Sequence, residues 1–187
     1  TTAPRACWIW VSRRVGRVST TSHLTTTRSS ASGAVCPACC TPRGAVATAS
    51  GQAAEFVTAA CLCDSGDHIV AASSLYGGTI TQFDVTLRRL GIDTTFVPAD
   101  QPDAFATAIR PNTKFLFAEV VANPSGIVAD IARLADIAHA HSIPLVVDAT
   151  TVTPYLCRPM ESGADIVLHS ATKFIGGHGN SIGGMIV

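Results

Sequence analysis

From about Val46 onward, short apolar runs alternate with longer segments in which apolar and polar residues recur at helical spacing. The short runs predict strands, because strands buried on both faces of a sheet are continuously apolar. These runs lie at 68–72, 93–97, 113–119, 144–148, 166–169 and 182–187. The longer segments predict helices at 51–62, 78–90, 102–110 and 130–141. Alternating strands and helices indicate an α/β fold with a largely parallel sheet.

Local signals support several of these helices. Ser50 precedes the helix at 51–62 and is a favourable N-cap residue. Pro102 stands at the start of its helix, and Gly91 follows the helix at 78–90 and ends it. In the helix at 130–141, apolar residues recur at 131, 134, 135, 137 and 138, which is the spacing of an amphipathic helix.

Residues 1 to about 45 lack this periodicity and differ in composition. Six of the 13 basic residues, all arginines, precede Glu55, whereas all 13 acidic residues lie at Glu55 or later. We therefore expect an atypical Arg/Ser/Thr-rich segment at 1–45, disordered or mis-translated, and a folded domain at 46–187. An organelle transit segment also fits this acid-free composition. The segment has no lysine cluster, so we expect no nucleic-acid partner.

Composition and cysteine usage narrow the class of protein further. The hydrophobic fraction of 47% is too high for a disordered chain, and no run of about 18 apolar residues predicts a membrane span. The seven cysteines do not form a disulfide framework, which favours a reducing compartment, and we expect a cytoplasmic location. Cys36 and Cys39 have the spacing of zinc ligands, which Cys61 and Cys63 would complete. We favour Cys61 and Cys63 as small buried hydrophobes and expect no metal.

The most informative segment follows the apolar run at 166–169. Ser170, Thr172 and Lys173 come next, before a glycine-rich turn, so two hydroxyls and one amine stand at a strand end. Hydroxyls there can hold a phosphate, and the amine can form a Schiff base with an aldehyde. Pyridoxal phosphate (PLP) carries both groups and is held by its enzymes through such a lysine. Lys114 is the only other lysine in the sequence. The alternative is a surface lysine beside small polar residues.

Asp148 ends the apolar run at 144–148 and is a candidate partner for Lys173. A PLP site needs a carboxylate against the pyridine nitrogen, because the protonated ring accepts electrons from a substrate carbanion. The alternative is an N-cap role for Asp148 in a loop between strand and helix. Ligand sites of open parallel sheets lie at the carboxyl ends of the strands, so the two residues are expected at one edge.

Further residues are expected at the same edge. The backbone N–H groups of Gly51 and Gln52 open a helix and can bind an anion, although an ordinary N-cap is the alternative. Tyr76 follows the strand at 68–72, where its ring can lie on a cofactor ring or serve in packing. Asn123 follows the strand at 113–119 and offers both a donor and an acceptor, with a turn as the alternative.

Residues 45–187 resemble the large domain of the Cys/Met-metabolism PLP enzymes. The resemblance rests on six motifs: 50–54 (SGQAA), 74–79 (SLYGGT), 123–124 (NP), 147–148 (VD), 153–159 (TPYLCRP) and 169–179 (HSATKFIGGHG). The last two motifs are most similar to those of the O-acetylhomoserine sulfhydrylases. The implied fold is the large domain of the aspartate-aminotransferase type, with a seven-stranded sheet. The implied cofactor is PLP, and the implied substrate is a small amino acid.

The resemblance also implies a role for each matching residue. Lys173 would hold the cofactor and move protons between Cα and Cβ of the substrate. Asp148 would pair with the pyridinium, Tyr76 would stack on the ring, and Asn123 would lie near the ring hydroxyl or the substrate carboxylate. The phosphate would be held by Ser170, Thr172 and the amides of Gly51 and Gln52. The implied reaction is γ-replacement, in which sulfide or methanethiol displaces acetate from O-acetylhomoserine to give homocysteine or methionine.

Departures from the family leave other interpretations open. The segment 1–45 lacks the Tyr that the family supplies, with an Arg, to a neighbouring subunit, Ala149 stands where the family commonly has Asn, and no Arg follows Lys173 to grip a substrate carboxylate. We expect the chain to be a fragment, or a faulty gene model, of a homo-oligomeric (dimeric or tetrameric) sulfhydrylase. Cystathionine γ-synthase or a γ-lyase, and a non-catalytic PLP-binding chain, are the alternatives.

Overall fold

A seven-stranded sheet runs through residues 44–187, the part of the chain that the computed structural model describes. Its strand order is β1-β7-β6-β5-β4-β2-β3. The strands are β1 (Val46–Thr48), β2 (His68–Ala72), β3 (Asp93–Val97), β4 (Thr113–Glu119), β5 (Leu145–Asp148), β6 (Ile166–His169) and β7 (Gly184–Ile186). Residues 1–43 lie outside the described part of the chain, so the predictions for this segment, including Cys36 and Cys39 as possible zinc ligands, are not tested by the structure.

Strands β3, β2, β4, β5 and β6 are parallel, whereas β7 is antiparallel to both β6 and β1. The expected α/β fold with a largely parallel sheet is therefore confirmed. All five parallel strands have their carboxyl ends at one edge. Loops that carry functional side chains gather at such an edge in open α/β sheets.

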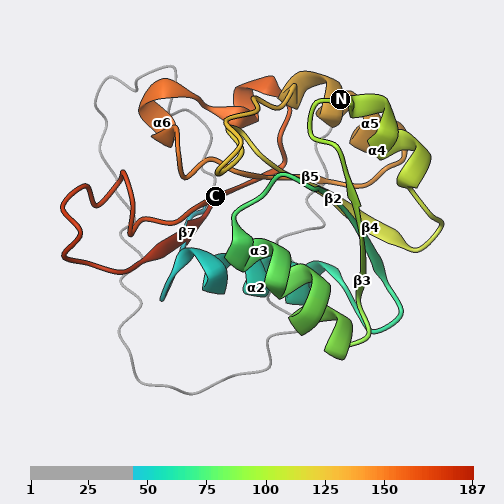
Figure 1. Cartoon of the computed structure of the whole chain (residues 1–187), viewed down its shortest axis with the longest axis horizontal. Helices are drawn as coiled ribbons and strands as arrows, with labels where there is room; N and C mark the ends of the chain where they lie inside the picture. Colours follow the sequence, from blue (N-terminus) through green and yellow to red (C-terminus); the bar gives the residue numbers. More distant parts are fainter. Residues whose placement is uncertain (1–43) are drawn as a thin grey trace. The chain divides into compact units, whose positions relative to one another are not determined.

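Helices cover both faces of this sheet. They are α2 (Gly51–Leu62), α3 (Gly77–Thr81), the π-helix η2 (Gln82–Leu87), α4 (Pro102–Ala108), α5 (Ile131–Ala140), α6 (Thr153–Leu156) and the 3₁₀-helix η3 (Pro159–Ser162). Figure 1 shows α2 and α3 on one face and α4 and α5 on the other. Among the described residues, no helix combines the length and the apolar character that a membrane crossing requires.

Most element bounds agree with the sequence pattern. The strands at 68–72, 93–97, 113–119 and 166–169 and the helix at 51–62 have the predicted bounds. The helix at 102–110 ends at Ala108, because Pro111 disfavours a helical conformation in the residue before it. The strand at 144–148 begins at Leu145, since Pro144 has no N–H for the ladder. The predicted helix at 78–90 is α3 followed by η2, and the strand at 182–187 is limited to β7.

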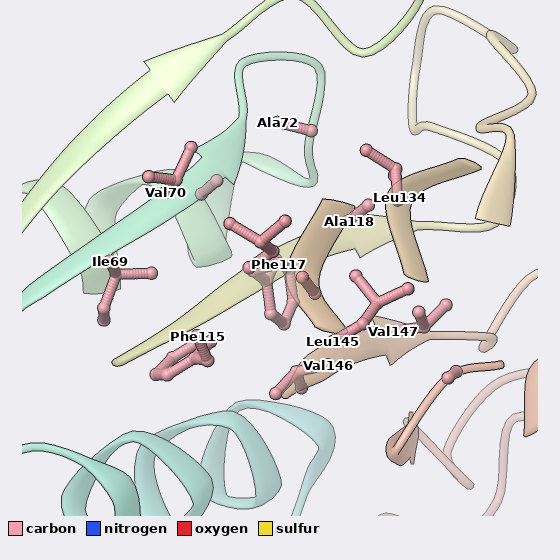
Figure 2. Close-up of a cluster of buried hydrophobic side chains, with 14 of the residues drawn as sticks. Ile69, Val70, Ala72, Phe115, Phe117, Ala118, Leu134, Leu145, Val146 and Val147 are labelled. Carbon is pink, nitrogen blue, oxygen red and sulfur yellow. The ribbon is translucent and has the colours of Figure 1, made fainter. Parts of the chain in front are cut away.

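The core is formed where β2, β4 and β5 meet the helices. Every residue of β2 is buried, and only Lys114 of β4 is exposed. Figure 2 shows side chains of the three strands packed together, with Leu134 of α5 beside them. Phe117 of β4 also meets Phe83 of η2 edge to face, with ring centroids 4.9 Å apart. The five apolar residues that recur along α5 are all buried against the sheet side of the helix. This rigid centre fixes the strand ends and the loops that leave them.

Candidate functional site

A cavity of about 430 Å³ opens at the carboxyl edge of the parallel strands. All eight residues predicted from the sequence to form the site line it. The lining residues are Ser50, Gly51, Gln52, Glu55, Tyr76, Glu119, Val121, Asn123, Asp148, Thr150, Thr151, Ser170, Thr172, Lys173, Phe174 and Ile182. They come from the start of α2, from the last residues of β4 and β5, and from the loops that follow β2, β4, β5 and β6. Segments far apart in the sequence therefore converge on one space.

The N-terminus of α2 points its backbone donors toward this space. Ser50 has extended backbone angles, and its Oγ accepts a hydrogen bond of 3.1 Å from the Ala53 N–H, so the expected N-cap is present. The N–H groups of Gly51 and Gln52 precede the first intrahelical bond and have no partner within the helix. Together with the helix dipole, they favour an anion. A Cβ on Gly51 would lie 2.6 Å from the Ser170 Cβ, which places the helix start directly against the loop after β6.

The loop after β6 is tied down by several polar contacts. The Ser170 N–H donates to the Thr150 Oγ1 at 2.7 Å, and the Lys173 N–H donates to the Ser170 carbonyl oxygen at 3.1 Å. The Thr172 Oγ1 accepts from the Gly183 N–H at 3.0 Å and donates to the Gly183 carbonyl oxygen at 3.1 Å. The Thr172 hydroxyl therefore closes the loop, and a phosphate would compete with Gly183 for its proton. Lys173 is exposed at the wall of the cavity.

Asp148 ends β5 and lies beside Glu119 of β4 in the sheet register. Its Oδ1 accepts a hydrogen bond of 2.7 Å from the Thr150 N–H. Burial raises the pKa of Asp148, against the effect of the bonds from Thr150. The N-cap of α6 is Val152, so Asp148 does not have the alternative N-cap role. A carboxylate held in this way is stabilised by a cation placed against it.

Glu119 was missed by the sequence analysis, although it stands at a predicted strand end. It is 7% exposed, and both of its carboxylate oxygens accept backbone bonds. The Tyr76 N–H donates to Oε1 at 2.7 Å, and the Asn123 N–H donates to Oε2 at 2.9 Å. Burial raises the pKa of Glu119, while these two bonds oppose the shift. An acid at the carboxyl end of a buried strand was the signal that could have identified it.

Glu55 was also missed. It is 4% exposed on the inner side of α2, where its Oε1 accepts a hydrogen bond of 2.8 Å from the Thr79 hydroxyl. The second oxygen, Oε2, is buried without a partner. Burial raises the pKa of Glu55 to about 8, and the charges of Asp148 and Glu119 add to the shift against the Thr79 bond. The carboxyl is therefore mostly neutral at pH 7. The signal was an acid on the apolar side of a helix that opens at the site.

Tyr76 and Asn123 bring different groups to the cavity. The Tyr76 residue is 49% exposed, and a Cβ on Gly78 would lie 2.6 Å from its Cε1. Gly78 thus leaves room for the tyrosine ring at the start of α3. Asn123 begins a turn in which the Gly126 N–H donates to the Ala122 carbonyl oxygen at 2.8 Å. Asn123 is therefore a turn residue, as the alternative interpretation predicted, and it also lines the cavity.

The combination of groups defines a chemical class. An amine from Lys173, a carboxylate from Asp148 and an anion site at the start of α2 surround one cavity, with an aromatic ring at its side. The glycine at position 51 lets the start of α2 approach Ser170 closely, which brings the anion site of the helix and the Ser170 hydroxyl together, as a bound phosphate requires. These residues fit PLP, so the class of protein that the fold and the site indicate is a PLP-dependent enzyme. In residues 44–187, no cluster of His, Cys, Asp or Glu side chains has the arrangement of a metal site.

Residues 25–187 match the family described as "Cys/Met metabolism PLP-dependent enzyme", and the chain belongs to this family. PLP is the cofactor that the family implies. The match begins inside the segment 1–45, which we expected to depart from the family. The resemblance stated from the motifs is confirmed.

The chain is similar in sequence to characterised proteins and in structure to a solved enzyme. The chain is 54% identical over 144 residues to "Sulfhydrylase FUB7" of Fusarium oxysporum, covering 76% of this chain and 33% of that protein. It is 49% identical over 144 residues to the O-acetyl-L-homoserine sulfhydrylase of Corynebacterium glutamicum, with the same coverage. The crystal structure of cystathionine gamma-lyase from Lactobacillus plantarum, complexed with L-serine, is similar with a TM-score of 0.75 and 39% identity. That match covers 78% of this chain and 38% of that chain. The aspartate-aminotransferase-type fold is confirmed, and the chain spans about a third of the length of these curated relatives.

Proposed function

We propose that the whole protein is a PLP-dependent sulfhydrylase that acts on O-acetylhomoserine. Sulfide or methanethiol replaces acetate: the Cγ–O bond breaks, acetate leaves with its oxygen, and a Cγ–S bond forms to give homocysteine or methionine. The observation that carries this proposal is the convergence of Lys173, Asp148 and the start of α2 on one cavity. The names of the relatives at 54% and 49% identity support the choice of reaction.

Each proposed role follows from the chemistry of the side chain. When bound, the cofactor supplies an electron sink that makes the protons on Cα and Cβ of the substrate acidic. The Lys173 amine would hold the cofactor through its aldehyde and would move protons between Cα and Cβ of the substrate. Asp148 would keep a proton on the pyridine nitrogen, because a buried carboxylate favours a cation beside it. Tyr76 would stack on the ring.

The remaining proposed residues would bind and orient the cofactor. The N–H groups of Gly51 and Gln52 bind the phosphate at the helix N-terminus, with Ser170 and Thr172 as hydroxyl donors. Asn123 orients either the ring hydroxyl or the substrate carboxylate through its side-chain amide. Such positioning accounts for a large part of catalysis, since it removes the entropy of bringing reactants together.

The full-length protein with PLP tests this proposal. O-acetylhomoserine and sulfide are supplied, and homocysteine is measured, with Lys173→Ala as the negative control. Turnover on the order of 1 per second, lost in the variant, supports the proposal. Cystathionine formation from cysteine would instead assign the synthase activity, and cleavage of cystathionine would assign the γ-lyase. Tight PLP binding without any of these reactions would assign a non-catalytic role.

We also propose that the whole protein is a homo-oligomer, that it is cytoplasmic and that it has a boundary near residue 45. Enzymes of this kind are expected to be homo-oligomers, and size-exclusion chromatography with light scattering tests that. The free thiols of Cys63 and Cys157 are consistent with a cytoplasmic location. The compositional break near residue 45 is proposed as the boundary between the atypical segment 1–45 and the partial PLP-binding domain 46–187.

A further inference from the structure

Glu119 connects two loops that are distant in the sequence. The Tyr76 N–H donates to one carboxylate oxygen at 2.7 Å, and the Asn123 N–H donates to the other at 2.9 Å. Tyr76 follows β2 and Asn123 follows β4, so one side chain spans the ends of two adjacent parallel strands. The Glu119 side chain is thereby fixed at both of its oxygens.

The two bonds favour the ionised form of Glu119, against the effect of its burial. A carboxylate accepts at both oxygens, whereas a protonated carboxyl group carries a hydrogen on one of them and loses acceptor capacity there. Hydrogen bonds to an ionised acceptor are stronger than neutral ones. Because Glu119 is 7% exposed, its charge depends on these two amides for stabilisation. The carboxylate and the two loops therefore hold one another in place.

The two loops that Glu119 holds carry the aromatic ring of Tyr76 and the side-chain amide of Asn123, which both line the cavity. Tyr76 immediately precedes α3, and its side chain is half-exposed at the cavity. Asn123 precedes the turn that ends at Gly126. In the same sheet register, Glu119 lies next to Asp148. One carboxylate thus sets where the tyrosine and the asparagine stand relative to Asp148.

We propose that Glu119 is a positioning residue, whose carboxylate places Tyr76 and Asn123 together against the cofactor ring. This inference rests on the proposed PLP site, and it assigns Glu119 no contact with the reacting atoms. Replacing the carboxylate by an amide turns one acceptor into an NH2 donor that faces a backbone N–H. One of the two loops is then released while the size of the side chain is kept.

Glu119→Gln in the full-length protein tests the proposal through two readouts. Hydrogen exchange is followed by mass spectrometry at residue level, without and with PLP, and the dissociation constant of PLP is measured by absorbance. We expect exchange at Tyr76 or Asn123 to rise about tenfold or more, and the PLP dissociation constant to rise about tenfold, the effect of leaving one buried donor unpaired. Exchange at Ala54 in α2 should stay as in the wild type.

Asp165→Asn is the matched control. The Asp165 carboxylate accepts a backbone hydrogen bond of 2.8 Å from Leu145, at the amino end of β5 and away from the cavity. This control should leave both the PLP dissociation constant and the exchange at Tyr76 and Asn123 unchanged. If Glu119→Gln does not fold, Glu119→Asp is measured instead. It keeps the charge but is one methylene too short to reach both amides, so the same selective release is expected.

The outcomes separate this inference from the proposed function. Unchanged exchange at both amides, or a uniform rise that includes Ala54, would overturn the positioning role, even if the wild type binds PLP. A selective rise at Tyr76 or Asn123 with PLP binding unaltered would also overturn it, since the loops would then be held for folding alone. A wild type that does not bind PLP would refute the proposed site instead.

Discussion

Gly51 and Ser170 approach so closely that a Cβ on Gly51 would lie 2.6 Å from the Ser170 Cβ and 3.0 Å from its Oγ. Gly51→Ala must therefore displace the loop after β6. We expect the PLP dissociation constant to rise at least tenfold and the unfolding free energy to fall by about 1–3 kcal/mol, as in other overpacked sites. Absorbance titration and urea denaturation measure these effects.

The control for this substitution is Gly77→Ala, because a Cβ on Gly77 would meet no atom within 4 Å. It should leave the PLP dissociation constant within about twofold of the wild type, a change below 0.5 kcal/mol. Equal PLP binding by Gly51→Ala and the wild type would mean that this close contact does not shape a phosphate site.

Lys173 is expected to be the residue that binds the cofactor covalently. Addition of PLP to the wild type should give an absorbance band of the lysine-bound cofactor, which Lys173→Ala removes. Borohydride reduction followed by peptide mass spectrometry should find the cofactor on Lys173. Lys114 is the natural control, since it is the second residue of β4 and pairs with Asp67 at 3.4 Å, away from the cavity. Recovery of the label on Lys114 would contradict the assignment.

Asp148→Asn should impair turnover more than cofactor binding. The substitution removes the negative charge that keeps the pyridine nitrogen protonated, so carbanion stabilisation is lost. In the full-length protein we expect kcat to fall at least about 100-fold, near 3 kcal/mol. Asp130→Asn is the control, because Asp130 caps α5 outside the cavity and Asn is an equally good cap. Turnover of Asp148→Asn within about threefold of the wild type would remove Asp148 from the site.

Glu55 should make the stability of the cofactor-free protein depend on pH. Its pKa is raised from 4.5 to about 8, so the folded state binds a proton that the unfolded state releases above pH 4.5. The stabilisation is complete below pH 4.5 and is lost as the pH rises through 8. Between pH 6 and 8, the wild type should lose about 2 kcal/mol of unfolding free energy relative to Glu55→Gln. Urea denaturation at both pH values measures this difference, and parallel curves for the two proteins would contradict it.

Much of the fold follows from local patterns. β2 and β4 are apolar along their length because both of their faces are covered, and their bounds were read directly from the sequence. The inner face of α5 follows from helical spacing. By contrast, β1 has three residues and α6 has four, which is too short for a periodic signal. The antiparallel direction of β7 depends on its partners β1 and β6, and no pattern within β7 itself encodes it.

The site residues that could be predicted from the sequence are those with reactive or charged side chains at the ends of predicted strands. Asp148 ends one buried strand and Lys173 follows the next, so topology brings them to one edge. Glu119 has the same placement, but its role depends on two backbone amides that only the folded loops bring within reach. Glu55 lies on a helix, and its raised pKa comes from burial together with the charges of Asp148 and Glu119. Such three-dimensional proximity cannot be read from spacing along the chain.

The first and last strands of the described fold are hydrogen-bonded to each other, with Val46 opposite Ile186 and Thr48 opposite Gly184. Gly184 also lies against the Ser50 carbonyl oxygen, with no space for a side chain between them. The start of α2 therefore reaches its final surroundings only after β7 has joined the sheet. On the ribosome, a nascent chain that stops short of Ile186 would lack this support. Cofactor loading should accordingly follow the emergence of β7 from the exit tunnel.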